Sequence, residues 1–513
     1  MGISGAPWDE HVDVIVAGSG AGAMAGALTA AAKGLRTVVL EKTPLLGGTS
    51  AYSGAAIWLP GSQVQERDGA GDSTGSARTY LKALLGEESA EYREAFLATA
   101  PEVVEFLEND PAVEFKWQPF PDYFDAPGRL DMGRAFIPRV LPRERIGELA
   151  ALVRPPVDRD RAGLGHDPDA PLVQGRALIG RLLLALTATG NATVRTGTAL
   201  TGLVVEDGRV VGVEAEGHDG PVRLRAERGV LLAAGGFERD PATREAHGVP
   251  GSAEWTMAPA GSNTGGAIAA AARIGAATGL MDQGWWCPGL ATPDGGAAFT
   301  LGFRGGLIVD ASGNRFANES LPYDQMGRRM AEAPGRVPAH LIFDSRSEGL
   351  PAISIPTAVP DEHLAAGTWI KADTLAELAG KLDLPADALT ATVERFNGFA
   401  EKGVDEDFHR GEDAYDRFFS TGKGPNPALV PVDRPPYYAA KVVLSDLGTK
   451  GGLRTDTDGR VLDASGAPIP GLYASGNSSA SFTGPYYPGP GIPIGTAMVF
   501  AYRAVHHMRG EER

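Results

Sequence analysis

A glycine-rich turn between two apolar runs near the N-terminus constrains the fold of this chain more than any other feature. Residues 13–17 are mostly β-branched, residues 18–23 read Gly-Ser-Gly-Ala-Gly-Ala, and residues 24–33 are strong helix formers. Gly34 then interrupts the helical pattern, and residues 36–41 form a second β-branched run that ends in an acid. This order predicts a strand, a helix and a second strand parallel to the first.

The turn has the spacing of the Rossmann dinucleotide-binding fingerprint. Gly18 permits the tight turn, Gly20 lets the backbone approach a pyrophosphate at the helix N-terminus, and Ala23 takes the third position, where only a small residue fits. Glu41, at the end of the second strand, can accept hydrogen bonds from an adenosine ribose. The motif in this context therefore predicts a bound dinucleotide.

The segment that follows the second strand favours FAD over NAD. Residues 47–54 read Gly-Gly-Thr-Ser-Ala-Tyr-Ser-Gly. They supply close backbone and hydroxyl donors where the ribityl-phosphate arm of a flavin would run. An NAD site does not need such a stretch.

The length of 513 residues allows roughly two to four domain-sized units. Residues from about 280 to 445 change to a mixture of short β-rich and helical runs, including helical stretches at 375–382 and 385–399 and a polar segment at 403–424. We therefore expect an α/β protein whose Rossmann-like FAD-binding domain is discontinuous, with an inserted α+β catalytic domain. The expected division is 1–280 and 445–513 for the FAD-binding domain and 281–444 for the catalytic domain.

Further elements are expected on both sides of the insertion. Residues 193–216 predict two strands around an Asp-Gly turn, and residues 229–236 predict a buried strand that ends in glycines, a pattern repeated at 471–477. Residues 154–169 indicate a long, charged surface loop. A final helix is expected from Ile494 to Met508, directly after Pro493.

Charge and cysteine content exclude several classes of function. The formal net charge is −17, which repels nucleic acid and anionic membrane surfaces. One cysteine, Cys287, cannot form an intramolecular disulfide, ligate an iron–sulfur cluster or supply a Cys-x-x-Cys pair. It is expected to be a packed thiol rather than a flavin attachment point, and it indicates a reducing cytoplasm. No membrane span, metal site or Gly-x-Ser-x-Gly nucleophile is expected.

Motifs at both ends of the chain resemble the succinate dehydrogenase/fumarate reductase flavoprotein superfamily. The superfamily resemblance is carried by the Rossmann unit and by residues 47–54, 231–236, 263–265 and 471–477. Longer motifs resemble the 3-ketosteroid Δ1-dehydrogenase family within it, namely Phe-Pro-Asp-Tyr at 120–123, Asn-Glu-Ser-Leu-Pro-Tyr-Asp at 318–324, Ser-Asp-Leu-Gly-Thr-Lys-Gly-Gly at 445–452 and Tyr-Pro-Gly-Pro-Gly-Ile-Pro at 487–493.

The same motifs differ from those of fumarate reductases at two positions, which indicates that this chain does not reduce fumarate. Fumarate reductases carry an arginine four residues after an Arg-Phe-x-Asn-Glu pattern, whereas this chain reaches Tyr323 there. They also place a histidine before a Thr-x-Gly-Gly turn, whereas this chain has Leu447 and Gly448 before Thr449. Tyrosines and glycine amides suit a neutral, largely apolar ketone.

The resemblance implies dehydrogenation of 3-ketosteroids at C1–C2, with the hydride passing to flavin N5. It implies that the Tyr487 hydroxyl and the Gly491 amide bind the 3-keto oxygen, that Tyr323 is the base for the C2 proton, and that Tyr123 hydrogen-bonds that base. Three prolines at 488, 490 and 493 leave few N–H donors in this loop, which fits an oxyanion hole. An unperturbed tyrosine has a pKa of about 10, so the base role requires a stabilised phenolate.

The resemblance and the fingerprint together assign the contacts of a non-covalent FAD and of the steroid. The expected FAD contacts are Gly18, Ser19, Gly20, Gly22, Ala23, Glu41, Lys42, Gly48, Thr49, Ser50, Ser53, Gly54, Ala199, Ala234, Gly235, Gly476, Asn477, Pro493 and Ile494. The expected steroid-lining residues are Phe120, Phe299, Ile353 and Ile355. A quinone-like or other external oxidant is the expected electron acceptor.

Two alternatives stay open at this point. A related enzyme could act on 3-ketosteroids at C4–C5, which needs a differently placed base. A non-catalytic flavoprotein could bind FAD without a substrate of its own.

Overall fold

The computed structural model describes residues 7–346 and 350–511, which fall into two compact units. The first unit consists of the described residues within 1–247, 258–283 and 448–513, and the second unit of the described residues within 248–257 and 284–447. The second unit is thus close to the expected insertion at 281–444, but it also takes a ten-residue segment from further upstream. The roles expected for the two domains stay predictions.

A mixed sheet with a parallel centre organises the first unit. In the described residues its strand order is β18-β19-β8-β1-β2-β5, with the antiparallel strands β6 and β7 continuing from β8. β1 pairs in parallel with both β2 and β8, and β19 pairs in parallel with β8. The strands of this unit are β1 (Glu10–Ala17), β2 (Thr37–Leu40), β3 (Phe115–Trp117), β4 (Phe136–Pro138), β5 (Ala192–Arg195), β6 (Ala199–Glu206), β7 (Arg209–Gly217), β8 (Gly220–Leu232), β9 (Thr278–Gly279), β17 (Gly452–Leu453), β18 (Arg460–Leu462) and β19 (Pro468–Ala474).

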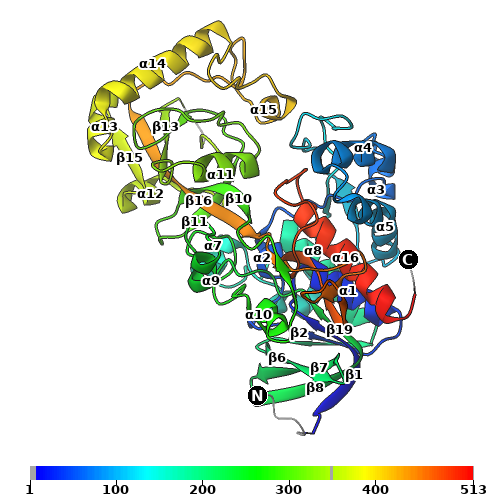
Figure 1. Ribbon diagram of the computed structural model, residues 1–513. Helices are drawn as coiled ribbons and strands as arrows, with labels where there is room; N and C mark the ends of the chain where they lie inside the picture. The colour runs from blue at the N-terminus through cyan, green and yellow to red at the C-terminus, as the bar shows by residue number, and fades with distance from the viewer. Residues whose placement is uncertain (1–6, 347–349, 512–513) are drawn as a thin grey trace. The chain divides into compact units, whose positions relative to one another are not determined.

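Helices pack around this sheet, and α1 and α16 lie side by side (Figure 1). They are α1 (Ala21–Ala32), α2 (Gly48–Tyr52), α3 (Gln63–Asp68), α4 (Thr74–Leu85), α5 (Ala90–Glu108), α6 (Arg143–Ile146), α7 (Val157–Arg161), α8 (Gln174–Ala188), α9 (Pro241–Ala246), α10 (Gly266–Ala272) and α16 (Ile492–Met508), with the 3₁₀ turns η1 (Gly147–Leu152) and η2 (Gly476–Ser478).

The predicted βαβ unit is present and forms the centre of the first unit. Residues 14–16 of β1 are fully buried, because a central parallel strand is covered on both faces. Ala23 in α1 is fully buried as well. A Cβ at Gly26 would lie 3.3 Å from the Cβ of Ala501, so the small residues of α1 allow α16 to approach closely.

Three sequence predictions for this unit are refined by the structure. The predicted buried strand before Gly235 and Gly236 is present, but it is the end of the 13-residue β8, which stops at Leu232 and whose polar first half pairs with β7. Residues 154–169 are not only a surface loop, because they contain α7 and the buried Arg154. The final helix begins at Ile492 rather than Ile494, and Pro493 is tolerated inside it because first-turn N–H groups have no intrahelical partner.

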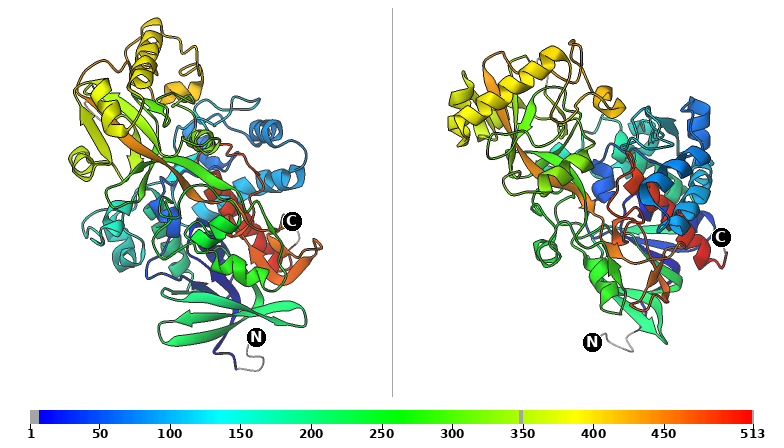
Figure 2. Two further views of the ribbon diagram at one scale, coloured as in Figure 1. Left: turned by 60° about the vertical axis from the view of Figure 1, so that its left-hand side comes forward. Right: turned by 45° about the horizontal axis from the view of Figure 1, so that its top comes forward.

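The predicted hairpin is present, with a refinement at its start. β6 and β7 are antiparallel around Asp207 and Gly208, which both have positive φ, as a tight hairpin turn requires. Residues 193–195 belong instead to β5, which pairs in parallel with β2. Figure 2 shows β6, β7 and β8 as a twisted ribbon beside the N-terminal strand.

A second sheet, whose strands do not lie in chain order, organises the second unit. In the described residues its order is β12-β13-β16-β10-β11-β14, and β15 pairs with β16. The strands are β10 (Gly284–Ala291), β11 (Ala297–Leu301), β12 (Leu307–Val309), β13 (Ala339–Asp344), β14 (Ile353–Ile355), β15 (Trp369–Ala372) and β16 (Tyr437–Thr449). The helices are α11 (Tyr323–Ala331), α12 (Pro360–Ala366), α13 (Leu375–Leu382), α14 (Ala386–Lys402) and α15 (Ala414–Phe418).

One apolar core of the second unit lies between its sheet and two helices. Leu378 of α13 and Phe396 of α14 are buried in a cluster with Leu307 and Ile342 of the sheet. The sequence predicts both helices, α13 with the observed bounds and α14 with a start one residue early and an end three residues short. The two helices, yellow in Figure 2, lie side by side.

The segment at 403–424, which the sequence identified as polar, is partly helical and partly buried. It contains α15 and the buried residues Asp405 and Arg410.

Over residues 7–346 and 350–511, we find no helix with the length and apolar character that crossing a lipid bilayer requires.

Candidate active site

The turn after β1 brings bare backbone to the start of α1. Gly18 has a φ of +104°, and a Cβ there would lie 2.2 Å from the carbonyl oxygen of Ala233. Gly20 precedes α1 and contributes no side-chain cap, while a Cβ at Gly22 would lie 2.9 Å from the Cβ of Ala497. Only small residues are possible here, so the first-turn amides and the positive end of the helix dipole face the loop.

Glu41 directly follows β2, and hydrogen bonds fix the position of its carboxylate. Its carboxylate accepts hydrogen bonds from the Ser19 hydroxyl at 2.5 Å and from the backbone N–H and the hydroxyl of Thr43, both at 2.8 Å. A carboxylate has roughly four acceptor positions, so capacity remains for a ribose hydroxyl. The neighbouring Lys42 ammonium donates to the Thr264 hydroxyl at 2.9 Å.

The hydroxyl-rich segment forms α2 and packs against the start of α1. The Ala21 N–H donates to the Ser50 hydroxyl at 3.1 Å, which joins α1 to α2. The Asn263 amide donates to the Thr49 hydroxyl at 3.4 Å, and the Ser53 hydroxyl donates to the Ser50 carbonyl at 2.8 Å. Three of the expected FAD contacts, Thr49, Ser50 and Ser53, therefore lie within one short helix and its C-cap.

The glycine-rich ends of β8 and β19 also meet. The Ala234 N–H donates to the Ser478 hydroxyl at 2.9 Å, and that hydroxyl donates to the Gly235 carbonyl at 2.8 Å. Gly476 and Asn477 lie with Ser478 in η2, one residue after β19. Ser478 joins the two predicted segments, and the sequence analysis did not single it out.

For three of the residues expected to contact FAD, the structure gives no contact that marks the residue as part of a cofactor site. A Cβ at Gly48 or Gly54 would meet no atom within 4 Å. Ala199 is half-buried at the first position of β6. Their contacts with FAD stay predictions.

The start of α16 is a second place where only glycine fits. Gly491 has a φ of +88°, and a Cβ there would lie 2.1 Å from the carbonyl oxygen of Ala56. Its own carbonyl accepts from the Gly495 N–H at 2.9 Å, and no side chain caps the helix. Pro493 and Ile494 occupy the first turn.

These residues fit a bound FAD. Gly18 and Gly491 show why, because a side chain at either position would overlap backbone, and the helix starts beside them present N–H groups instead. The start of α1 would take the pyrophosphate, and Glu41 would take the adenosine ribose. The positive end of α16 suits negative charge on a reduced flavin ring.

Two of the predicted tyrosines pack against each other in the first unit. The ring centroids of Tyr123 and Tyr487 are 5.3 Å apart, and both side chains are buried. The half-buried Phe120 ring lies 6.0 Å from that of Tyr123. Three of the residues expected around the substrate therefore form one aromatic group, and Tyr487 in this group lies four positions before Gly491.

The carbonyl of Pro488 ties the two tyrosine-bearing loops together. It accepts hydrogen bonds from the Tyr123 N–H at 3.0 Å and from the Tyr80 hydroxyl at 2.7 Å. The Tyr80 hydroxyl in turn accepts from the Phe124 N–H at 3.0 Å. Burial raises the pKa of Tyr80 well above its ordinary value, so this phenol stays protonated and keeps donating.

A buried ion network includes Asp122, the residue that directly precedes Tyr123. The Arg134 guanidinium lies 2.8 Å from a carboxylate oxygen of Asp122 and 2.8 Å from one of Asp72, and all three side chains are fully buried. Asp122 also accepts from the Trp58 indole N–H at 2.9 Å. Because Asp122 directly precedes Tyr123, this network fixes the position of the Tyr123 backbone.

Tyr323 is the first residue of α11 in the second unit. It is 5% exposed, and its ring lies edge-on to Phe299 at a centroid distance of 4.9 Å. A Cβ at Gly327 would lie 2.7 Å from the Cβ of Trp286, so α11 packs closely on β10 and this glycine permits it. The position of Tyr323 is therefore set by helix packing rather than by a free loop.

The other expected steroid-lining residues are strand neighbours of Phe299. In the pairing of β11 with β14, Phe299 lies opposite Ile355 and Leu301 lies opposite Ile353. All four side chains are half-buried, because alternate residues of a strand share one face. Leu301 completes this apolar strip, and its period-two spacing from Phe299 is the signal that could have identified it.

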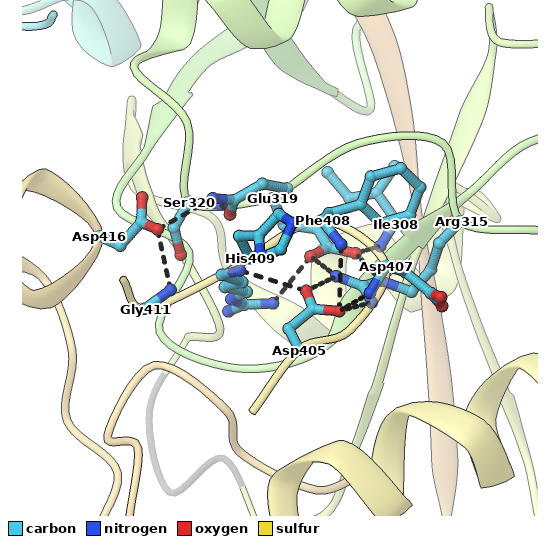
Figure 3. Close-up of polar contacts among 12 residues, drawn as sticks. Ile308, Arg315, Glu319, Ser320, Asp405, Asp407, Phe408, His409, Gly411 and Asp416 are labelled. Carbon is cyan, nitrogen blue, oxygen red and sulfur yellow. Dashed lines mark hydrogen bonds and ion pairs between the residues drawn. The ribbon is translucent and has the colours of Figure 1, made fainter. Parts of the chain in front are cut away.

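A second buried ion network lies just before Tyr323 in the sequence (Figure 3). The Arg315 guanidinium contacts both the Glu319 carboxylate, at 2.8 Å, and the Asp405 carboxylate, at 2.8 Å. Glu319 also accepts from the fully buried Arg410 at 3.1 Å. Burial alone would raise the pKa of Glu319, but the two arginines hold that pKa below its ordinary value. The carboxylate therefore stays charged.

Asp416 adds an anchor to the same segment (Figure 3). Its carboxylate accepts from the Asn318 amide at 2.9 Å and from the Gly411 N–H at 2.8 Å. The Asn318 side-chain oxygen accepts from the Ser320 N–H at 2.8 Å. Residues 315–320, which lead to Tyr323, are thus fixed to the segment that the sequence identified only as polar.

Cys287, the one cysteine of the chain, is fully buried in β10. Burial raises the pKa of its thiol well above the ordinary value. The prediction of a packed thiol is confirmed.

Comparison with known proteins shows the cofactor class. The FAD binding domain family matches residues 13–494 of this chain. The match includes the turn at Gly18, the α2 segment and the first turn of α16. FAD is therefore the cofactor of this protein, as the sequence predicts.

Several similar proteins carry the names of steroid dehydrogenases. The chain is 44% identical over 516 residues to the 3-oxosteroid 1-dehydrogenase of Rhodococcus opacus. The match covers 98% of this chain and 99% of that protein. The chain belongs to the 3-oxosteroid 1-dehydrogenase family. A solved structure of 3-ketosteroid Δ1-dehydrogenase from Sterolibacterium denitrificans, in complex with 1,4-androstadiene-3,17-dione, matches with a TM-score of 0.88 at 34% identity and covers 98% of this chain and 99% of that one.

A 3-ketosteroid Δ4-(5α)-dehydrogenase is structurally more distant. The structure of this enzyme from Rhodococcus jostii, in complex with 4-androstene-3,17-dione, matches with a TM-score of 0.71 at 25% identity, and the match covers 98% of both chains. Membership of the 3-oxosteroid 1-dehydrogenase family therefore confirms the resemblance found in the sequence motifs.

Proposed function

We propose that this protein removes one hydrogen each from C1 and C2 of 3-ketosteroids and leaves a double bond conjugated with the ketone. The observation that carries this proposal is the buried contact of Tyr123 with Tyr487, which lies on the loop that ends at Gly491. A phenol and a backbone N–H are the donors that a developing enolate oxygen needs. The substrate is a neutral ketone.

Each group of the chain has a separate task in this reaction. The Tyr487 hydroxyl and the Gly491 N–H hold the 3-keto oxygen, which makes the C2 proton more acidic. The Tyr323 phenolate takes that proton, and the Tyr123 hydroxyl supports Tyr323 in its charged form. Bound FAD supplies the acceptor for the hydride that leaves C1. The hydride carries away the two electrons of the C1–H bond, while the proton leaves without electrons, so the two electrons of the C2–H bond stay to form the C1–C2 double bond.

The steroid rings contact apolar side chains. Phe120 lines the site beside Tyr123, and its half-buried ring supports this role. Phe299, Ile353 and Ile355 line it beside Tyr323, where together with Leu301 they form a half-exposed apolar strip. Flat apolar walls with a few convergent polar groups are typical of sites for such ligands.

The electrons leave the protein to an external oxidant, for which a quinone is our proposal. A chain with one cysteine cannot ligate an iron–sulfur cluster that would carry the electrons onward. The same single cysteine supports a reducing, cytoplasmic location.

The experiment is a product assay with 4-androstene-3,17-dione and an artificial electron acceptor. We expect the 1,4-diene as product, together with anaerobic loss of the visible absorbance of the flavin when the steroid is added. No turnover of this steroid, but oxidation of a 5α-reduced 3-ketosteroid, would assign the protein to C4–C5 chemistry. No loss of flavin absorbance with any 3-ketosteroid would identify a flavoprotein without a steroid substrate.

A further inference from the structure

A buried lysine contacts the loop that carries Tyr487, the tyrosine that holds the ketone in our proposal. Lys450 directly follows β16 and is 1% exposed. Its ammonium donates hydrogen bonds to the carbonyls of Pro485 and Tyr486, at 2.9 Å and 2.8 Å. These are the two peptide carbonyls that immediately precede Tyr487.

The charge of Lys450 faces the ring of Tyr487. The ammonium nitrogen lies 6.0 Å from the centroid of that ring, within the range of a cation–π contact. Lysine is almost never fully buried, and a buried ammonium is costly unless other groups compensate its charge. A positive charge at this distance in a buried site also draws electron density from the phenol, and this makes its hydroxyl a stronger donor.

The backbone around Lys450 is fixed on both sides. Its N–H donates to the Gln283 carbonyl at 2.9 Å, and its carbonyl accepts from the Ser481 N–H at 3.1 Å. The Tyr486 carbonyl also accepts from the Thr483 hydroxyl at 3.0 Å. The ammonium is therefore held in one place relative to the loop that carries Tyr487.

We propose that Lys450 is a positioning residue for the dehydrogenation, which orients Tyr487 through two carbonyls and strengthens its hydroxyl as a donor to the 3-keto oxygen. This inference rests on the role of Tyr487 in the proposed function. Lys450 touches neither substrate nor cofactor in this proposal, and it acts only through Tyr487.

The test is the infrared carbonyl stretch of bound 1,4-androstadiene-3,17-dione, measured without turnover. The conjugated C3 ketone absorbs apart from the C17 ketone, which serves as an internal reference. Strong donors lower the C3 stretch. We expect Tyr487→Phe to shift it upward most, Lys450→Met to shift it upward in part, and Lys441→Met, which removes an exposed lysine from β16, the strand before Lys450, to leave it unchanged.

Turnover gives a second readout on the same variants. We expect Lys450→Met to keep FAD and to lower kcat about 10-fold, less than the 10²- to 10³-fold typical of a lost oxyanion donor. The double variant Lys450→Met/Tyr487→Phe should be no slower than Tyr487→Phe alone, because Lys450 acts through that hydroxyl. Lys450→Gln, which keeps a donor without the charge, should lie between Lys450→Met and the unchanged protein.

Each other outcome has a definite meaning. If Tyr487→Phe changes the C3 stretch and kcat but Lys450→Met changes neither, the inference is wrong and the proposed function stands. If Tyr487→Phe changes neither, the proposed role of Tyr487 fails first. If both Lys450→Met and Lys450→Gln lose FAD or fail to fold, Lys450 is required for the fold alone and the inference is rejected.

Discussion

Replacing Tyr323 by phenylalanine is expected to lower the rate of steroid oxidation by about 10²- to 10⁴-fold, the range typical of a lost general base. The hydroxyl is the group that takes the C2 proton in our proposal. The phenyl ring that remains can still pack against Phe299, whose centroid lies 4.9 Å away. FAD content and steroid affinity should therefore stay close to those of the unchanged protein.

The measurement is the rate of anaerobic flavin reduction by 4-androstene-3,17-dione, with FAD content taken from the absorbance spectrum. Tyr438→Phe is the matched control, because it removes a hydroxyl from the same unit, on a ring stacked with Phe343 at 5.3 Å, and should not change the rate. Unchanged flavin reduction in Tyr323→Phe would end the assignment of Tyr323 as the base.

Replacing Gly18 by alanine is expected to abolish FAD binding and to lower the free energy of unfolding by about 3 kcal/mol or more. The new Cβ would overlap the backbone of Ala233, 2.2 Å from its carbonyl oxygen, and φ of +104° is strained for any L side chain. Neither strand can move without disturbing the parallel pairing of β1 with β8.

Gly34→Ala is the matched control for this prediction. Gly34 lies just beyond the other end of α1 with a φ of +80°, but a Cβ there would meet no atom within 4 Å. We expect it to keep FAD and to cost about 1 kcal/mol from backbone strain alone. The two proteins are compared by denaturant unfolding and by the ratio of flavin to protein absorbance. Equal FAD content in both would show that the close approach at Gly18 is not needed for the cofactor.

Local patterns in the sequence were sufficient to predict several elements of both units. The βαβ unit, the β6–β7 hairpin and α13 each follow from a periodicity or a turn signal within about thirty residues. The tyrosine pair was found through its motifs, because the Phe-Pro-Asp-Tyr and Tyr-Pro-Gly-Pro-Gly segments lie over 360 residues apart and no local rule joins them.

The groups that hold the tyrosines could not be predicted in the same way. Arg134 pairs with Asp72 across 62 residues, and Arg315 pairs with Asp405 across 90. A charged residue in sequence is by default a solvated one, so nothing local distinguishes these arginines from exposed ones. Lys450 lay inside a recognised motif, but only the structure shows that its ammonium points at the carbonyls before Tyr487.

The central claim is that Tyr487 and Gly491 hold the ketone oxygen, and a crystal structure of the FAD-loaded protein with 1,4-androstadiene-3,17-dione tests it most directly. Our account predicts that the C3 oxygen lies about 3 Å from both the Tyr487 hydroxyl oxygen and the Gly491 nitrogen. A steroid bound with that oxygen out of hydrogen-bond reach of both groups would contradict the account.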